Sequence, residues 1–122
     1  MLCGICDSGK TTILSQLIAG KTVQTYTSMQ HNKFQFSLEN KNPVNLVDVP
    51  GNDRVRGQVV DQFSSSARAI VFVVDSNTVS KQIRDVAEYL HFLLTNKNII
   101  NNRFVKIVKI LLLCHYSSFF IF

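Results

Sequence analysis

Four residues near the start of the chain have the types and the spacing of a phosphate-binding loop. Gly4, Gly9, Lys10 and Thr11 fill the pattern Gly-x-x-x-x-Gly-Lys-Thr between a short apolar stretch and an amphipathic one. Glycine lets the backbone curl so that successive amides face phosphate oxygens, and the start of a helix adds the positive end of its dipole. The lysine can reach the β- and γ-phosphates, and the threonine hydroxyl can bind Mg²⁺. The stretch therefore predicts a site for a nucleotide and magnesium.

A second motif, Asp-Val-Pro-Gly at 48–51, ends an apolar run. A carboxylate at the end of a buried strand beside a phosphate loop can hold Mg²⁺ directly or through water, so Asp48 is a predicted metal ligand. Gly51 can then bring its amide close to the γ-phosphate. The alternative is an ordinary Pro-Gly turn with an aspartate cap, which we favour less because the phosphate loop lies in the same chain.

Between these motifs, residues 21–32 are rich in Thr, Ser and Gln and predict a polar loop. A hydroxyl from this loop could complete the shell of ligands around Mg²⁺, and Thr27 is the residue that we choose. A polar loop without any role in metal binding explains the stretch almost equally well.

The elements that must position these residues alternate along the chain. Alternating or β-branched runs predict strands, and apolar residues at helical spacing predict helices between them. The expected strands cover 1–5, 34–39, 44–49 and 69–75, with another ending near Cys114, and the expected helices cover 10–19, 58–66 and 79–94. This order predicts an α/β fold, the three-layer fold of P-loop NTPases, with a mostly parallel sheet and helices on both faces. One antiparallel pair, 34–39 with 44–49, is expected, and the fold is expected to be incomplete at the C-terminus.

Composition limits the class of protein. With 122 residues, of which 46% are hydrophobic and 17% charged, the chain is expected to be globular rather than disordered. We divide it into a nucleotide-binding domain at 1–95 and a divergent apolar tail at 96–122, which combines a partial last strand with an irregular end. The net charge of +5 is scattered, which favours anions such as nucleotide phosphates and excludes the basic stripe of a nucleic-acid-binding protein.

Four stretches carry a family likeness: CDSGKTT, DVPGNDRVR, SSARAIVFVVDS and VAEYL. They resemble the β-subunit of the signal recognition particle receptor, a small Ras-like GTPase closest to the Arf and Sar branch, over roughly residues 2–95. The resemblance implies that GTP and Mg²⁺ are bound and that the switch regions dock the α-subunit of the receptor. It also implies a place on the cytosolic face of the endoplasmic reticulum membrane, held there by a segment that this chain lacks.

The resemblance also assigns roles to residues. Those that contact the nucleotide would be Gly4, Asp7, Ser8, Gly9, Lys10, Thr11, Thr12 and Gly51. Those that bind the metal would be Thr11, Thr27 and Asp48. Arg54, Arg56 and the loop 21–32 would belong to the switch surfaces that meet a partner.

Three departures from the family pattern change what we expect. Asn52 stands where the family has a glutamine or histidine that orients water, so hydrolysis is expected to be slow at best and Asn52 is a weak catalytic candidate. The stretch His115–Ser118 replaces the expected guanine-reading motif, so the preference for GTP rests on the resemblance alone. The chain also begins inside the first strand, and we expect it to be truncated at both ends.

Two other readings of the chain remain open. A small P-loop ATPase or nucleoside kinase would need a lid or an arginine finger, and the sequence offers no arginine-rich lid segment. The chain could instead be an inactive fragment that lacks base recognition. Residues 104–122 are expected to form a buried strand and a loose end rather than a membrane anchor, because lysines interrupt the apolar run.

Overall fold

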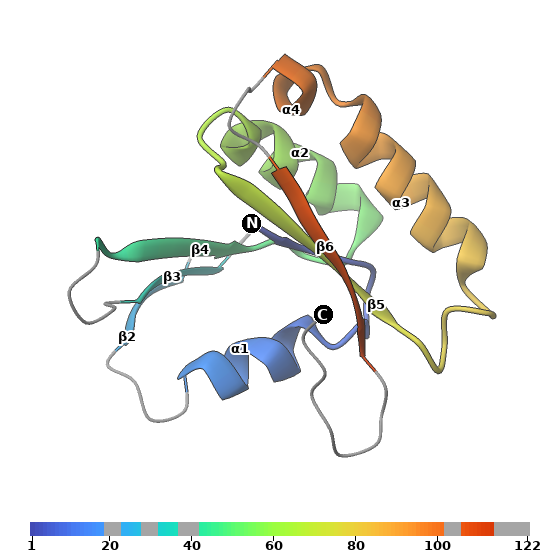
Figure 1. The fold of residues 1–122 in the computed structure, drawn as a ribbon, viewed down its shortest axis with the longest axis horizontal. Coiled ribbons are helices and arrows are strands. Elements are labelled where there is room, and N and C mark those ends of the chain that lie inside the picture. Colours follow the sequence, from blue (N-terminus) through green and yellow to red (C-terminus); the bar gives the residue numbers. More distant parts are fainter. Residues whose placement is uncertain (19–22, 28–31, 37–41, 102–105, 114–122) are drawn as a thin grey trace.

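The computed structural model describes residues 1–18, 23–27, 32–36, 42–101 and 106–113 (Figure 1). The strands are β1 (Leu2–Cys3), β2 (Val23–Thr27), β3 (Asn32–Phe36), β4 (Val44–Asp48), β5 (Ala69–Asp75) and β6 (Lys106–Leu113). The helices are α1 (Lys10–Ile18), α2 (Asp53–Ser64), α3 (Ile83–Thr95) and α4 (Lys97–Asn101).

All of these strands join one sheet, in the order β2-β3-β4-β1-β5-β6. Strand β1 is parallel to both β4 and β5, and β6 is parallel to β5, so the centre of the sheet is parallel as predicted. The pair β3 and β4 is antiparallel, which confirms the expected pairing of those two segments. Strand β6 ends at Leu113, which also confirms the strand expected to end near Cys114.

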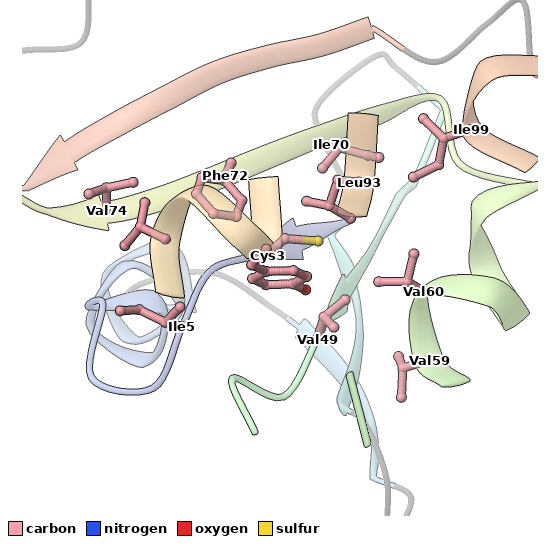
Figure 2. Close-up of a cluster of buried hydrophobic side chains, with 12 residues drawn as sticks. Cys3, Ile5, Val49, Val59, Val60, Ile70, Phe72, Val74, Leu93 and Ile99 are labelled. Carbon is pink, nitrogen blue, oxygen red and sulfur yellow. The ribbon is translucent and has the colours of Figure 1, made fainter. Parts of the chain in front are cut away.

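Helices cover both faces of the sheet, as Figure 1 shows: α1 lies on one side, and α2 and α3 lie on the other. Leu14 of α1 packs with Leu2, Phe34, Phe36 and Val73 in the smaller apolar cluster. The larger cluster fills the opposite side, where β1 and β5 meet α2 and α3 (Figure 2). The three-layer prediction is confirmed, because each face of a buried parallel sheet needs a helical cover.

The loop predicted at 21–32 is wrong for its central part. Residues 23–27 form strand β2, which is antiparallel to β3. The polar composition concealed this strand, although Val, Thr and Tyr are the residue types that pleated strands favour. Pairing with β3 satisfies backbone groups that a loop would leave to water.

The predicted helix boundaries also need correction. Helix α2 begins at Asp53 rather than 58 because Asn52 caps it. Helix α3 begins at Ile83 rather than 79, because the chain turns after β5 and the amide of Val79 donates to the carbonyl of Asp75 at 2.9 Å. The short helix α4 was not predicted from the sequence. Gly20, the expected end of the first helix, lies outside the described residues.

No helix within the described ranges is both long enough and apolar enough to cross a membrane. Part of the predicted tail belongs to the sheet, because β6 pairs with β5 from Lys106 opposite Ala69 to Leu113 opposite Asp75. Residues 114–122 lie outside the part of the chain that the structure describes, and the division at residue 95 stays a prediction.

Candidate functional site

The loop between β1 and α1 has the backbone that phosphate binding requires. Gly4 has a φ of 153° and Gly9 a φ of 91°, values that side chains rarely allow. A Cβ on Gly4 would lie 2.5 Å from the carbonyl oxygen of Val73 and 2.6 Å from Oγ of Ser8. Asp7 also has a positive φ, 59°, which aspartate tolerates better than most residues. The predicted glycines are therefore needed for the shape of the loop.

The side chain of Lys10 lies inside this loop and is hydrogen-bonded to it. Its Nζ donates to the carbonyl oxygens of Gly4 at 2.9 Å and Ile5 at 2.7 Å, and to Oγ of Ser8 at 3.2 Å. Burial lowers the pKa of Lys10, and the nearby carboxylate of Asp48 partly offsets this effect. A buried positive charge is thus held within the curve of the loop, at the start of α1, where an anion is stabilised most.

Asp48 supplies the matching negative charge from the end of β4, opposite Leu2 of β1. Its Oδ1 is buried and has no hydrogen-bond partner among the residues that the structure describes. Burial raises the pKa of Asp48, and Lys10 lowers it by a smaller amount. An unsatisfied buried carboxylate oxygen is costly, and a cation is the partner that would satisfy it best. Asp48 therefore fits the predicted magnesium site.

Two threonines of the predicted metal and phosphate set lie in the first turn of α1. Thr11 and Thr12 are exposed there, immediately after Lys10, so both remain accessible to a ligand. Ser8 is buried inside the loop, and Asp7 is exposed at its tip.

The structure does not bring Thr27 to the other metal candidates. Thr27 ends β2 opposite Asn32, and Asn32 lies opposite Asp48 in β4. Two strand spacings separate Thr27 from Asp48, roughly 10 Å between their backbones. A shared ion would require the segment around Thr27 to move toward Asp48.

Gly51 packs directly against the phosphate loop. A Cβ at this position would overlap the backbone nitrogen of Cys6 and would lie 2.6 Å from the carbonyl carbon of Ile5. Glycine is the only residue that permits this approach. The structure therefore brings together two motifs that lie far apart in the sequence.

The side chain of Asn52 has a structural partner. Its Oδ1 accepts a hydrogen bond of 2.9 Å from the amide of Arg54, so Asn52 caps α2. The signal for this cap was present in the sequence, since asparagine precedes Asp53 in the first helical turn.

Arg56, which the sequence predicts to lie on a switch surface, makes contacts that sequence reasoning missed. Its guanidinium carbon lies 4.3 Å from the centroid of the Tyr89 ring, and its Nη1 lies 3.5 Å from the carbonyl oxygen of Gly51. Arg54, which was predicted to share the same surface, is exposed. No local pattern indicates these contacts, because Tyr89 comes from a distant helix.

Comparison with known proteins agrees with this geometry. The family model "Signal recognition particle receptor beta subunit" matches residues 1–122. The "Signal recognition particle receptor subunit beta" of Rattus norvegicus is 41% identical over 101 residues, which are 81% of this chain and 38% of that protein. The Homo sapiens protein of the same name is 42% identical over 93 residues, which are 75% of this chain and 34% of that protein. The chain thus spans well under half the length of these relatives.

A solved structure gives the same result at the level of the fold. The chain described as "The Structure of the Mammalian SRP Receptor" superposes with a TM-score of 0.66 at 38% identity. The match covers 86% of this chain and 54% of that chain. This likeness supports the α/β fold predicted from the phosphate loop and the strand order.

Proposed function

Because this chain belongs to the family of signal recognition particle receptor β-subunits, we propose that it binds GTP with Mg²⁺ and acts as a nucleotide switch in protein targeting to the endoplasmic reticulum membrane. The observation that carries the proposal is the buried Lys10 ammonium, which interacts electrostatically with the half-buried carboxylate of Asp48 beside the loop. Lys10 donates hydrogen bonds to the carbonyl oxygens of Gly4 and Ile5. Oδ1 of Asp48 nearby has no hydrogen-bond partner among the described residues. A neighbouring ammonium and carboxylate suit a magnesium-bound polyphosphate.

Each residue of the loop has a proposed role in binding. The amides of residues 4–12 and the Lys10 ammonium would neutralise the phosphate oxygens. Thr11 and Asp48 would hold Mg²⁺, directly or through water, and Thr27 would join them once its segment moves. Bound Mg²⁺ supplies positive charge that the phosphates need in addition to Lys10.

The switch would arise at Gly51, whose position against the loop is set by backbone contacts with Ile5 and Cys6. A γ-phosphate would accept from the amide of Gly51 and so hold the start of α2 in place. Loss of the γ-phosphate would release this contact. Asn52 caps α2 through its amide oxygen, so its side chain is poorly placed to orient water, and we expect hydrolysis to be slow.

The partner that we propose is the α-subunit of the receptor, which would read the order of the switch. The side chain of Arg54 is exposed at the start of α2, one turn from Gly51. A bound partner could contact Arg54 there and respond to a change in the position of Gly51. We further propose that the complete protein acts at the cytosolic face of the endoplasmic reticulum membrane.

The proposal is tested by titrating the 122-residue chain into fluorescently labelled GTP with Mg²⁺, followed by competition with unlabelled GTP or ATP. We expect displacement by GTP but not by ATP, and loss of binding when a chelator removes Mg²⁺. Equal displacement by both nucleotides would mean that the phosphate loop is intact but the chain does not recognise the base. If the folded chain binds neither nucleotide, the proposal is wrong and the chain is an inactive fragment.

A further inference from the structure

Arg56 and Arg54 lie in the same first turns of α2, but their surroundings differ. Arg54 is exposed, whereas Arg56 is half-buried and faces α3. The Arg56 guanidinium lies over the Tyr89 ring at 4.3 Å, well inside the range of a cation–π contact. Its Nη1 lies 3.5 Å from the carbonyl oxygen of Gly51, at the long end of hydrogen-bond distance.

The ring under Arg56 is a rigid support. Tyr89 is fully buried and packs edge-on against Phe72 of β5, with ring centroids 5.4 Å apart. It also stacks with Phe92 at 6.3 Å. Phe72 belongs to the core cluster drawn in Figure 2, between β5 and the helices. Because close-packed cores resist displacement, the Tyr89 ring that the Arg56 guanidinium contacts is held in a fixed position.

Gly51 is therefore held from two sides. The backbone of Ile5 and Cys6 lies against the face where a Cβ would project. Arg56 lies at the carbonyl oxygen of the same residue, so it limits rotation of the peptide that follows Gly51. The Gly51 amide belongs to the preceding peptide, which rotates separately, so its direction is restricted by the contact of Arg56 together with the close approach of Gly51 to Ile5 and Cys6.

We propose that Arg56 is a positioning residue that holds Gly51 ready for a γ-phosphate and so sets the preference for a nucleoside triphosphate over a diphosphate. This inference rests on the proposed function, since it requires a nucleotide in the loop. A diphosphate lacks the γ-phosphate that would accept from the Gly51 amide, so its affinity should not depend on Arg56. Loss of one charged hydrogen bond and one cation–π contact predicts about a tenfold weaker affinity for the triphosphate.

The test measures dissociation constants for GDP and for a slowly hydrolysed GTP analogue with Mg²⁺, in the whole chain and its variants. In Arg56→Gln, we expect the GTP analogue to bind about tenfold more weakly and GDP to bind as in the unchanged protein. Arg54→Gln removes the same charge from the same helix and is the matched control, with both affinities unchanged. Tyr89→Phe keeps the ring and should keep the preference.

Each contrary result has a definite meaning. If Arg56→Gln keeps the triphosphate preference of the unchanged chain, the positioning role is wrong. It is also wrong if Arg54→Gln or Tyr89→Phe loses the preference as fully as Arg56→Gln. If the unchanged chain binds neither nucleotide, the proposed function itself fails, which is a separate outcome.

A second variant keeps the test decisive if Arg56→Gln does not fold. Arg56→Lys retains the positive charge on α2 but lacks the planar fork that can lie on a ring and donate to a carbonyl together. We expect a partial loss of the triphosphate preference, with GDP affinity unchanged. An unaltered preference in this variant would overturn the inference.

Discussion

Gly51→Ala is expected to lower the free energy of unfolding by about 2–3 kcal/mol, because overpacking against atoms that cannot yield is destabilising. The added methyl group would overlap the backbone nitrogen of Cys6 and lie 2.6 Å from the carbonyl carbon of Ile5. Both atoms belong to the phosphate loop, which is tied to Lys10 and cannot shift cheaply. Urea unfolding of the nucleotide-free chain measures this loss.

Gly57→Ala is the matched control for this prediction. It lies in the interior of α2, and its added methyl group would meet only the tip of the Phe92 ring at an ordinary 3.9 Å. Alanine is favoured over glycine inside a helix, so this variant should gain up to about 1 kcal/mol. If both variants shift stability equally, the close approach of Gly51 to the loop does not hold.

Asp48→Asn is expected to change stability and metal-dependent binding in opposite directions. Without nucleotide, the variant should melt at a higher temperature, because the buried Oδ1 of this half-buried carboxylate has no hydrogen-bond partner among the described residues and burial raises its pKa. With Mg²⁺ and GTP, the same substitution should weaken binding by about 10- to 100-fold, as is usual when a group that holds a metal is removed. Thermal melts and nucleotide titrations on one preparation test both effects.

The pH dependence of this stability difference has a definite sign. A carboxyl group whose pKa is raised in the folded state binds its proton more tightly there than in the unfolded chain. Its contribution to stability is present below the ordinary pKa of 3.8 and is lost as the pH rises through the raised value. The advantage of Asp48→Asn should therefore be small at acidic pH and largest near neutrality.

Asp75→Asn provides the comparison for this second prediction. Asp75 ends β5, which β1 separates from β4 in the sheet, but its carboxylate already accepts from the amide of Asn77 at 2.9 Å and from Oγ1 of Thr78 at 3.1 Å. Its replacement should give no gain in melting temperature. A higher melting temperature in Asp75→Asn but not in Asp48→Asn would contradict the assignment of Asp48 as the unsatisfied carboxylate.

The parts of this site that the sequence predicts are those that local rules determine. The spacing of Gly4, Gly9 and Lys10 is a property of one loop, so it predicts the positive φ angles and the reach of the lysine. The strand 69–75 was predicted at its observed bounds, because a β-branched run buried on both faces has no helical alternative. Local patterns suffice wherever one element determines its own shape.

The parts that the sequence does not predict depend on contacts between distant segments. Strand β2 forms because β3 pairs with it, although its composition is that of a polar loop. Arg56 was assigned to a partner surface, yet it lies on Tyr89 within the same chain. The close approach of Gly51 to Ile5 likewise exists only once β1 and β4 are parallel neighbours.

The switch itself is tested most directly by hydrogen exchange of the backbone amides, measured with saturating GTP analogue and with saturating GDP, both with Mg²⁺. We expect slower exchange at 48–56 in the triphosphate state, because a γ-phosphate would hold the Gly51 amide and the start of α2. Exchange in β5, at Ala69–Asp75, should be the same in both states and serves as the internal control. Equal exchange at 48–56 in the two states would show that this chain binds nucleotide without switching.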